Sequence, residues 1–229
     1  MKTIIITGAN GNLGTATVKK FLDNGYRIIA VDNADNNLQF AKGNENYEMH
    51  NVNLTDEPAV ADFTKSLFQK HGDIHGALLL VGGFAMGKID ETTTSDINKM
   101  RTLNFDTAYN IARPLFLHMM ERKYGRIVFV GARPALKPEQ GKNMIAYALS
   151  KSLLFRLAEV LNSQAKGVNV VSSVIVPSTI DTPANRQSMP DADPSNWVKA
   201  EQIAEVLEFI CSDKGLPVRE SVYKLYNNS

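Results

Sequence analysis

Short apolar runs alternate with longer amphipathic segments along the whole chain. The runs are rich in β-branched residues, and several are almost continuously apolar, which is typical of parallel strands that are covered on both faces. They lie at 2–7, 27–32, 46–50, 75–81, 125–131, 168–176 and 221–226. Between them, apolar residues recur with helical spacing at 12–24, 56–71, 95–123, 144–166 and 199–212.

This alternation of strand and helix predicts the fold class. Right-handed crossovers would join the strands into one doubly wound, mostly parallel seven-stranded α/β sheet with helices on both faces. No linker rich in proline, glycine or serine divides residues 1–229, so we expect a single domain. The stretch 177–198 is irregular and too long for an ordinary connection, and we interpret it as a lid within that domain.

Composition and charge narrow the class of protein. Hydrophobic residues make up 44% of the chain, which is enough for a full core, and 25 basic residues nearly balance 24 acidic ones. A net charge of +1 without runs of one sign argues against nucleic-acid and membrane-surface partners. The apolar stretch near the start is too short for a signal peptide, and no segment reaches the ~18 apolar residues of a membrane span. We therefore expect a cytoplasmic protein that acts on a small molecule.

Histidines and the single cysteine give no sign of a metal site. The four histidines lack metal-ligand spacing, and Cys211 falls in an apolar helical pattern that predicts a buried thiol. No metal is expected.

A glycine-rich turn follows the first predicted strand. Residues 7–14 read TGANGNLG, with glycines at 8, 11 and 14. Such a turn lets the backbone approach a pyrophosphate, while the amino end of the next helix offers free N–H groups and a partial positive charge. This context predicts a Rossmann fold that binds a dinucleotide. The expected contacts in the turn are Gly8, Asn10, Gly11, Asn12, Leu13 and Gly14.

Asp32 ends the second predicted strand, about 20 residues beyond the glycine turn. A carboxylate there can accept hydrogen bonds from a ribose 2′-hydroxyl and would repel a 2′-phosphate. We therefore expect NAD as the cofactor, with NADH preferred over NADPH.

Tyr147 and Lys151 open the helix after the fifth predicted strand. Residues four apart share one helix face, and the site lies beside the crevice where a doubly wound sheet changes direction. An ammonium group near the phenol is expected to lower the tyrosine pKa toward neutral pH. Tyr147 would then give a proton to a reduced substrate, and Lys151 would hold the ribose hydroxyls of the nicotinamide end.

With this turn, Asp32 and the segment YALSK (147–151), the chain resembles the short-chain dehydrogenase/reductase family over nearly its whole length. The resemblance implies a catalytic role for Asn104 beside Tyr147 and Lys151. It also implies cofactor contacts from three segments, NVNLTD (51–56), LVGGFAMG (80–87) and PSTIDTP (177–183). The residues concerned are Asn53, Leu54, Val81, Gly82, Gly83, Pro177, Ser178, Ile180 and Thr182. The family commonly pairs its long helices across a dimer axis, so a homodimer or homotetramer is implied.

Several positions depart from the family pattern. Asn53 replaces an aspartate, LVGGFAMG (80–87) replaces N-N-A-G, Ser178 replaces a glycine, and Ala132 stands where a catalytic serine is usual. Quinonoid dihydropteridine reductases, a narrower group of this family, also lack that serine, and their lid resembles DTPANRQSMPDADPSNW (181–197). A quinonoid ring spreads the charge it gains over several heteroatoms, so it needs less help from a hydroxyl donor than a ketone does. We expect the substrate to lie near Ala132, Phe84, Met189 and Trp197.

Two other functions stay open at this point. The chain could reduce a different carbonyl or imine, because one fold serves many substrates. It could also bind a dinucleotide without turnover, as a redox sensor or scaffold.

Overall fold

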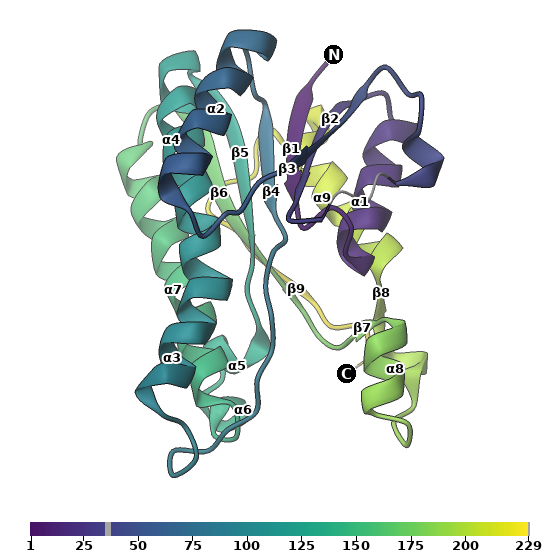
Figure 1. The fold of residues 1–229 in the computed structure, drawn as a ribbon, viewed down its shortest axis with the longest axis vertical. Helices are drawn as coiled ribbons and strands as arrows, with labels where there is room; N and C mark the ends of the chain where they lie inside the picture. The colour runs from purple at the N-terminus through teal and green to yellow at the C-terminus, as the bar shows by residue number, and fades with distance from the viewer. Residues whose placement is uncertain (35–37, 229) are drawn as a thin grey trace.

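The computed structural model describes residues 1–34 and 38–228, and its centre is one parallel sheet (Figure 1). Seven strands lie in the order β3-β2-β1-β4-β5-β6-β9, with every neighbouring pair parallel. The strands are β1 (Thr3–Thr7), β2 (Arg27–Asp32), β3 (Tyr47–Asn51), β4 (Gly76–Leu79), β5 (Tyr124–Val130), β6 (Asn169–Pro177) and β9 (Val222–Leu225). The predicted seven-stranded doubly wound sheet is confirmed.

Helices cover the sheet in two layers (Figure 1). One layer contains α2 (Glu57–His71), α4 (Thr107–Arg122) and α7 (Ile145–Gln164), and the other contains α1 (Asn12–Asp23) and α9 (Ala200–Cys211). Each layer closes its own apolar core, because side chains alternate between the two faces of every strand. Ile5 and Phe129 face the first layer, whereas Ile4, Ile6 and Cys211 belong to the second.

The long helix expected at 95–123 is interrupted in the structure. It consists of α3 (Thr94–Arg101), a π-helical turn at Thr102–Asp106, and α4. The start of α3 is fixed by a capping box, in which the side chains of Thr93 and Asp96 bond each other's backbone N–H groups. A π-helical turn widens the helix by one residue, and such turns are frequent at functional sites. The hydrophobic pattern carries no signal for it, because the apolar face continues through the turn.

The strand order changes direction between β1 and β4. From β1 the chain winds outward to β2 and β3, and then returns to β4 and winds the other way. Loops that leave the carboxyl ends of β1 and β4 therefore diverge and open a crevice, which is where doubly wound folds bind ligands.

The predicted lid is an arm with a fixed base. Its ends form a short parallel ladder between β7 (Ile180–Asp181) and β8 (Val198–Lys199), while α8 (Pro183–Ser188) and a 3-10 turn (Pro194–Asn196) lie between them. Figure 1 shows α8 standing apart from the sheet. In the described part of the chain, the remaining short helical segments are α5 (Arg133–Leu136), α6 (Pro138–Gly141) and 3-10 turns at Gln39–Ala41 and Asp213–Gly215.

Within the described ranges, none of the helices has the length and apolar character needed to cross a bilayer.

Helix α1 packs against the glycine turn without space for a side chain at Gly14. A Cβ atom there would overlap the Gly8 carbonyl oxygen and lie 2.8 Å from the Ala9 Cα atom. We expect Gly14→Ala to lower the free energy of unfolding by about 3 kcal/mol, because backbone atoms would have to move. Denaturant unfolding measures this change.

Gly25 provides the matched control. It has φ +76° and no atom within 4 Å of its ideal Cβ, so Gly25→Ala tests backbone conformation without a clash. That change should cost about 1 kcal/mol. Equal losses in the two variants would contradict the proposed close packing at Gly14.

Candidate active site

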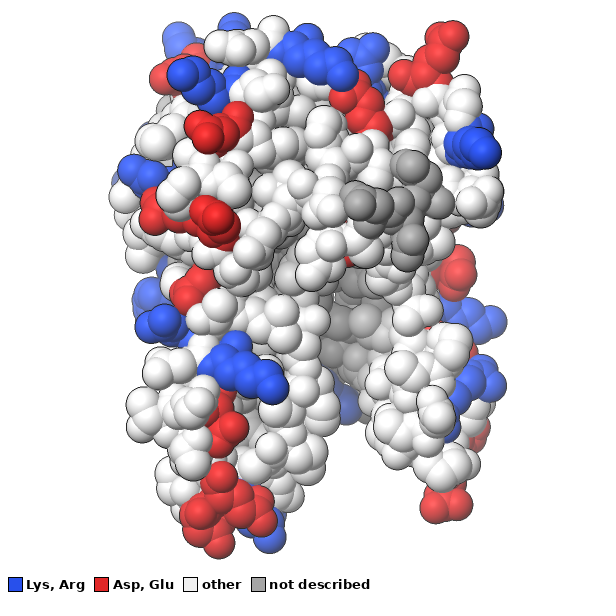
Figure 2. Space-filling view, viewed as in Figure 1, with Lys and Arg blue, Asp and Glu red and all other residues white. Residues whose placement is uncertain are grey.

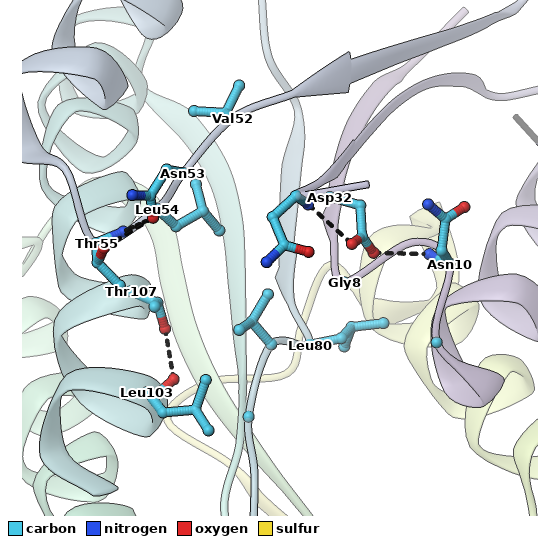
Figure 3. A pocket seen from close by; sticks show the side chains of 14 residues that line it. Gly8, Asn10, Asp32, Val52, Asn53, Leu54, Thr55, Leu80, Leu103 and Thr107 are labelled. Atoms are coloured by element: carbon cyan, nitrogen blue, oxygen red, sulfur yellow. Dashed lines mark hydrogen bonds between the residues drawn. The ribbon is translucent and has the colours of Figure 1, made fainter. Parts of the chain in front are cut away.

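A cavity of about 470 Å³ lies at the carboxyl ends of β1, β2 and β4 (Figure 3). It is lined by Gly8, Asn10, Gly11, Asp32, Asn33, Val52, Asn53, Leu54, Thr55, Leu80, Val81, Gly82, Leu103 and Thr107. Eight of the residues predicted to bind the cofactor are therefore brought together: Gly8, Asn10, Gly11, Asp32, Asn53, Leu54, Val81 and Gly82.

Two walls face each other across this cavity. In Figure 3, Asn53, Leu54 and Thr55 lie opposite Asp32 and Asn10. The Asp32 carboxylate is fixed by the N–H groups of Asn10, at 3.0 Å, and Asn33, at 2.8 Å. The carboxylate at the end of β2 thus keeps lone pairs that can accept a hydrogen bond from a ligand hydroxyl.

The glycine turn has the geometry that a phosphate group requires. Gly8 has φ +65°, and a side chain on it would lie 3.2 Å from the Val81 nitrogen. Among the residues that the structure describes, the amide oxygen of Asn10 is buried without a hydrogen-bond partner, so it can accept a hydrogen bond from a bound ligand. Asn12, Leu13 and Gly14 open α1 directly after the turn and do not line the cavity themselves. The first N–H groups of a helix have no partner within it, so this helix end offers donors next to the cavity. These features fit a dinucleotide.

Asn104 connects the segment after β4 to α7. It lies in the π-helical turn and is fully buried. Its amide oxygen accepts a hydrogen bond from the Gly83 N–H at 2.8 Å, and its amide nitrogen donates to the Ser150 hydroxyl at 3.0 Å. Ser150 in turn donates to the Tyr147 carbonyl at 2.8 Å. The structure therefore brings Gly83, Asn104 and Tyr147 into one network.

Lys151 is buried on the same helix and contacts the end of β5. Its ammonium group donates to the Val130 carbonyl at 2.8 Å. A Cβ atom at Gly82 would lie 3.0 Å from this nitrogen and 2.8 Å from the Asn104 amide oxygen. Gly82 thus lets the chain after β4 run directly over both side chains.

The electrostatics of Tyr147 differ from the expectation that Lys151 lowers its pKa. Burial raises the pKa of Tyr147 to about 12. Burial also lowers the pKa of Lys151 to about 8, because an ammonium group loses hydration in the site. The expected shift of the tyrosine pKa was wrong in direction, because desolvation of the phenol raises its pKa. Tyr147 is therefore a neutral phenol at pH 7, with its proton in place.

Phe84 lies over the phenol ring. The two ring centroids are 5.0 Å apart in an edge-to-face arrangement, while Phe84 keeps 59% of its surface exposed. One predicted substrate residue thus borders the predicted proton donor.

Ala132 is 4% exposed and follows β5 two residues beyond the carbonyl that Lys151 contacts. It supplies no hydroxyl at that place. Arg133 does not replace one, because its guanidinium group stacks on the Tyr226 ring with 5.0 Å between guanidinium carbon and ring centroid.

Other predicted residues lie outside the cavity of Figure 3. Pro177 ends β6, and Ser178, Ile180 and Thr182 lie in the chain that leads into the arm. Met189 is 38% exposed at the end of α8, and Trp197 is 8% exposed at the base of the arm. The backbone carbonyl of Trp197 accepts a hydrogen bond from Asn227, and Trp197 is not among the residues that line that cavity.

Sequence reasoning missed several residues of the site. The additional cavity residues are Asn33, Val52, Thr55, Leu80, Leu103 and Thr107, and Ser150 contacts Asn104. Spacing offered a signal for two of them, because Ser150 is three residues from Tyr147 and Thr107 is three from Asn104.

One face of the molecule is hollowed. Figure 2 shows a hollow between the region of α3, α5 and α6 and the arm with α8. Basic and acidic side chains are interspersed over the upper part of this face. Among the residues that the structure describes, no group of three histidine, cysteine, aspartate or glutamate side chains could hold a metal.

Comparisons with known proteins agree with this geometry. A family model described as short chain dehydrogenase matches residues 2–193. The dihydropteridine reductase of Dictyostelium discoideum is 27% identical, covering 100% of this chain and 96% of its own. A 3-oxoacyl-[acyl-carrier-protein] reductase of Thermotoga maritima is 23% identical over 93% of this chain and 91% of its own. A solved 4-hydroxyisoleucine dehydrogenase complexed with NADH superposes with a TM-score of 0.88 at 21% identity, covering 99% and 98% of the two chains.

The burial of Lys151 predicts how pH affects dinucleotide binding. Its pKa of about 8 means that the side chain is an ammonium below that pH and a neutral amine above it. If this charge holds ribose hydroxyls, the dissociation constant for NADH should rise about 10-fold as the pH increases through that value. Fluorescence of bound NADH measures the change.

Lys151→Arg is the control, because a guanidinium group keeps its charge throughout this range. The arginine variant should show a flat pH profile. A flat profile in the unmodified protein would contradict the assignment.

Proposed function

Because the chain belongs to the short-chain dehydrogenase family and is thus an NAD(P)-dependent oxidoreductase, we propose that it reduces a conjugated quinonoid acceptor of the dihydropterin type with NADH. The observation that carries this proposal is Ala132, a buried methyl group where a hydroxyl donor would be needed for an ordinary ketone.

The argument rests on where charge develops during reduction. A ketone concentrates the new negative charge on one oxygen, and a positioned hydroxyl stabilises that oxygen by a few kcal/mol. A quinonoid ring delocalises the charge over several heteroatoms and regains conjugation. Such an acceptor depends less on a local donor, so it suits a site in which Ala132 stands at the end of β5.

Tyr147 supplies the proton in this proposal. The bound nicotinamide would supply hydride. Since burial raises the pKa of Tyr147 to about 12, the phenol keeps its proton at neutral pH and can donate it to the reduced substrate. Lys151 orients the nicotinamide ribose, and Asn104 fixes the Gly83 backbone beside it. After transfer, the ammonium group of Lys151 stabilises the phenolate until water returns the proton.

Apolar surfaces around the site support a flat substrate. Phe84 is exposed beside Tyr147, Met86 is 64% exposed on the same segment, and Met189 is 38% exposed where α8 ends in the arm. Aromatic and thioether groups favour contact with heteroaromatic rings. The dihydropteridine reductase relative and the segment DTPANRQSMPDADPSNW (181–197) support the pterin class.

Asp32 supports NADH over NADPH. Its carboxylate lines the cavity and accepts two backbone N–H groups, which fixes its negative charge at the end of β2. A 2′-phosphate placed there would be repelled.

Exposed apolar side chains on α4 and α7 support a homodimer or homotetramer. Leu117 is 54% exposed on α4, and Leu149, Leu153 and Val160 are 51%, 40% and 46% exposed on α7. A two-fold axis would bury one such surface against its own copy.

The direct test follows the loss of NADH with a freshly generated quinonoid dihydropterin. We expect turnover that Tyr147→Phe reduces about 1,000-fold, because the proton donor is removed. Simple ketones should be poor substrates. Turnover with ketones or quinones alone would point to a different reductase, and tight NADH binding without any acceptor would contradict catalysis.

Ala132→Ser tests the role of the missing hydroxyl in the same assay. The variant should gain at least about 10-fold in kcat/KM for a simple ketone, with little change for the quinonoid substrate. Unaltered ketone activity would oppose the argument from charge delocalisation.

Replacing Asp32 tests the choice of cofactor. In Asp32→Asn, the ratio of kcat/KM for NADPH to that for NADH should rise at least about 10-fold, because the repulsive charge is lost. Asp62 is an exposed acid on α2, and Asp62→Asn should leave the ratio unchanged. The idea fails if both variants behave alike.

A further inference from the structure

Ser150 is a buried hydroxyl that joins two sides of the site. It is 3% exposed on α7 and lies between Tyr147 and Lys151 in the sequence. Its oxygen accepts from the Asn104 amide nitrogen at 3.0 Å and donates to the Tyr147 carbonyl at 2.8 Å. Both hydrogen-bonding functions of this hydroxyl are thus used inside the site.

Asn104 has no good substitute for this contact. Its amide oxygen is committed to the Gly83 N–H, and the other neighbour of its amide nitrogen is the Met100 sulfur at 3.9 Å, a weak acceptor. Because Asn104 is fully buried, loss of the serine hydroxyl would leave a buried donor nearly unsatisfied. The network therefore favours one position of α7 relative to the π-helical turn.

The backbone carbonyl of Tyr147 links Ser150 to the first turn of α7. In a regular α-helix this carbonyl also accepts the N–H of the residue four positions later, which here is Lys151. Ser150 thus binds the same carbonyl through which a regular helix would hydrogen-bond the backbones of Tyr147 and Lys151. The packing nearby is tight, since a Cβ atom at Gly82 would lie too close to both Asn104 and Lys151.

We propose that Ser150 is a positioning residue, which holds the first turn of α7 against Asn104 so that the Tyr147 phenol faces the reacting atoms. This inference rests on the proposed function for its kinetic consequence. The hydroxyl itself contacts Asn104 and the helix backbone and stays out of the cavity of Figure 3.

Ser152 offers a matched control on the same helix. Its hydroxyl donates to the Ala148 carbonyl at 2.7 Å, so it makes a similar bond to its own helix. No contact of the Ser152 side chain with Asn104 is present among the described residues. Ser152→Ala therefore removes a helix-bonded hydroxyl without touching the network.

The kinetic test compares Ser150→Ala with Ser152→Ala. Ser150→Ala should lower kcat for the quinonoid substrate by about 10-fold to 100-fold with KM for NADH within about twofold, because the phenol is displaced and the cofactor site is intact. Ser152→Ala should leave both parameters within about twofold. Equal kinetics for the two variants would overturn the proposal.

A second readout needs no substrate. In protein labelled with ¹³C-tyrosine, the Tyr147 signal is identified by its absence in Tyr147→Phe, and it is sensitive to position because the Phe84 ring lies 5.0 Å away. Ser150→Ala should move this signal, whereas Ser152→Ala should not. An unmoved Tyr147 signal in folded Ser150→Ala protein would overturn the positioning role.

The two readouts separate failure of this inference from failure of the proposed function. If the unmodified protein does not reduce a quinonoid dihydropterin, the proposed function fails, and the Tyr147 signal alone decides the role of Ser150. If the alanine variant unfolds, Ser150→Cys carries the same comparison, because a thiol keeps the volume and is a weaker hydrogen-bonding group.

Discussion

Desolvation of Tyr147 and Lys151 is the interaction on which the rest of the site depends. The Lys151 side chain lies between the end of β5, the segment after β4 and the π-helical turn, and the Tyr147 ring packs edge-to-face against Phe84. Water solvates a charge poorly at both places. That burial keeps the phenol protonated and leaves the ammonium group easily discharged. A more exposed pair would have ordinary pKa values and would be less sensitive to a bound cofactor.

The parallel sheet makes this burial possible. Strand order places β1 and β4 side by side with diverging loops, and glycines at 8, 14 and 82 let backbone and side chains approach closely there. At each of these positions, glycine lacks the stabilising contacts that a side chain would make. Its small size lets a ligand or a neighbouring segment come close. The site is therefore a property of the fold's architecture as much as of its reactive groups.

The sequence predicted the sheet well and the chemistry less completely. All seven predicted strands correspond to strands of the sheet. The nearly continuous apolar runs, such as those of β1 and β6, are a strong signal for buried parallel strands. The π-helical turn that holds Asn104 left no trace in the apolar pattern, and the contact between Asn104 and Ser150 joins residues 46 positions apart. The pKa of Tyr147 was mispredicted for a related reason. Spacing on a helix reports which groups are neighbours, whereas desolvation depends on segments that arrive from elsewhere in the chain.

The ladder between β7 and β8 has a consequence for how the chain could diversify. It pairs residues 180–181 with 198–199, so the two ends of the segment between them lie side by side. After β8 the chain enters α9, whose apolar face packs in the core. Residues 182–197 therefore lie outside the seven-stranded sheet, and exchanging them for a segment of another length would leave its strand order unchanged.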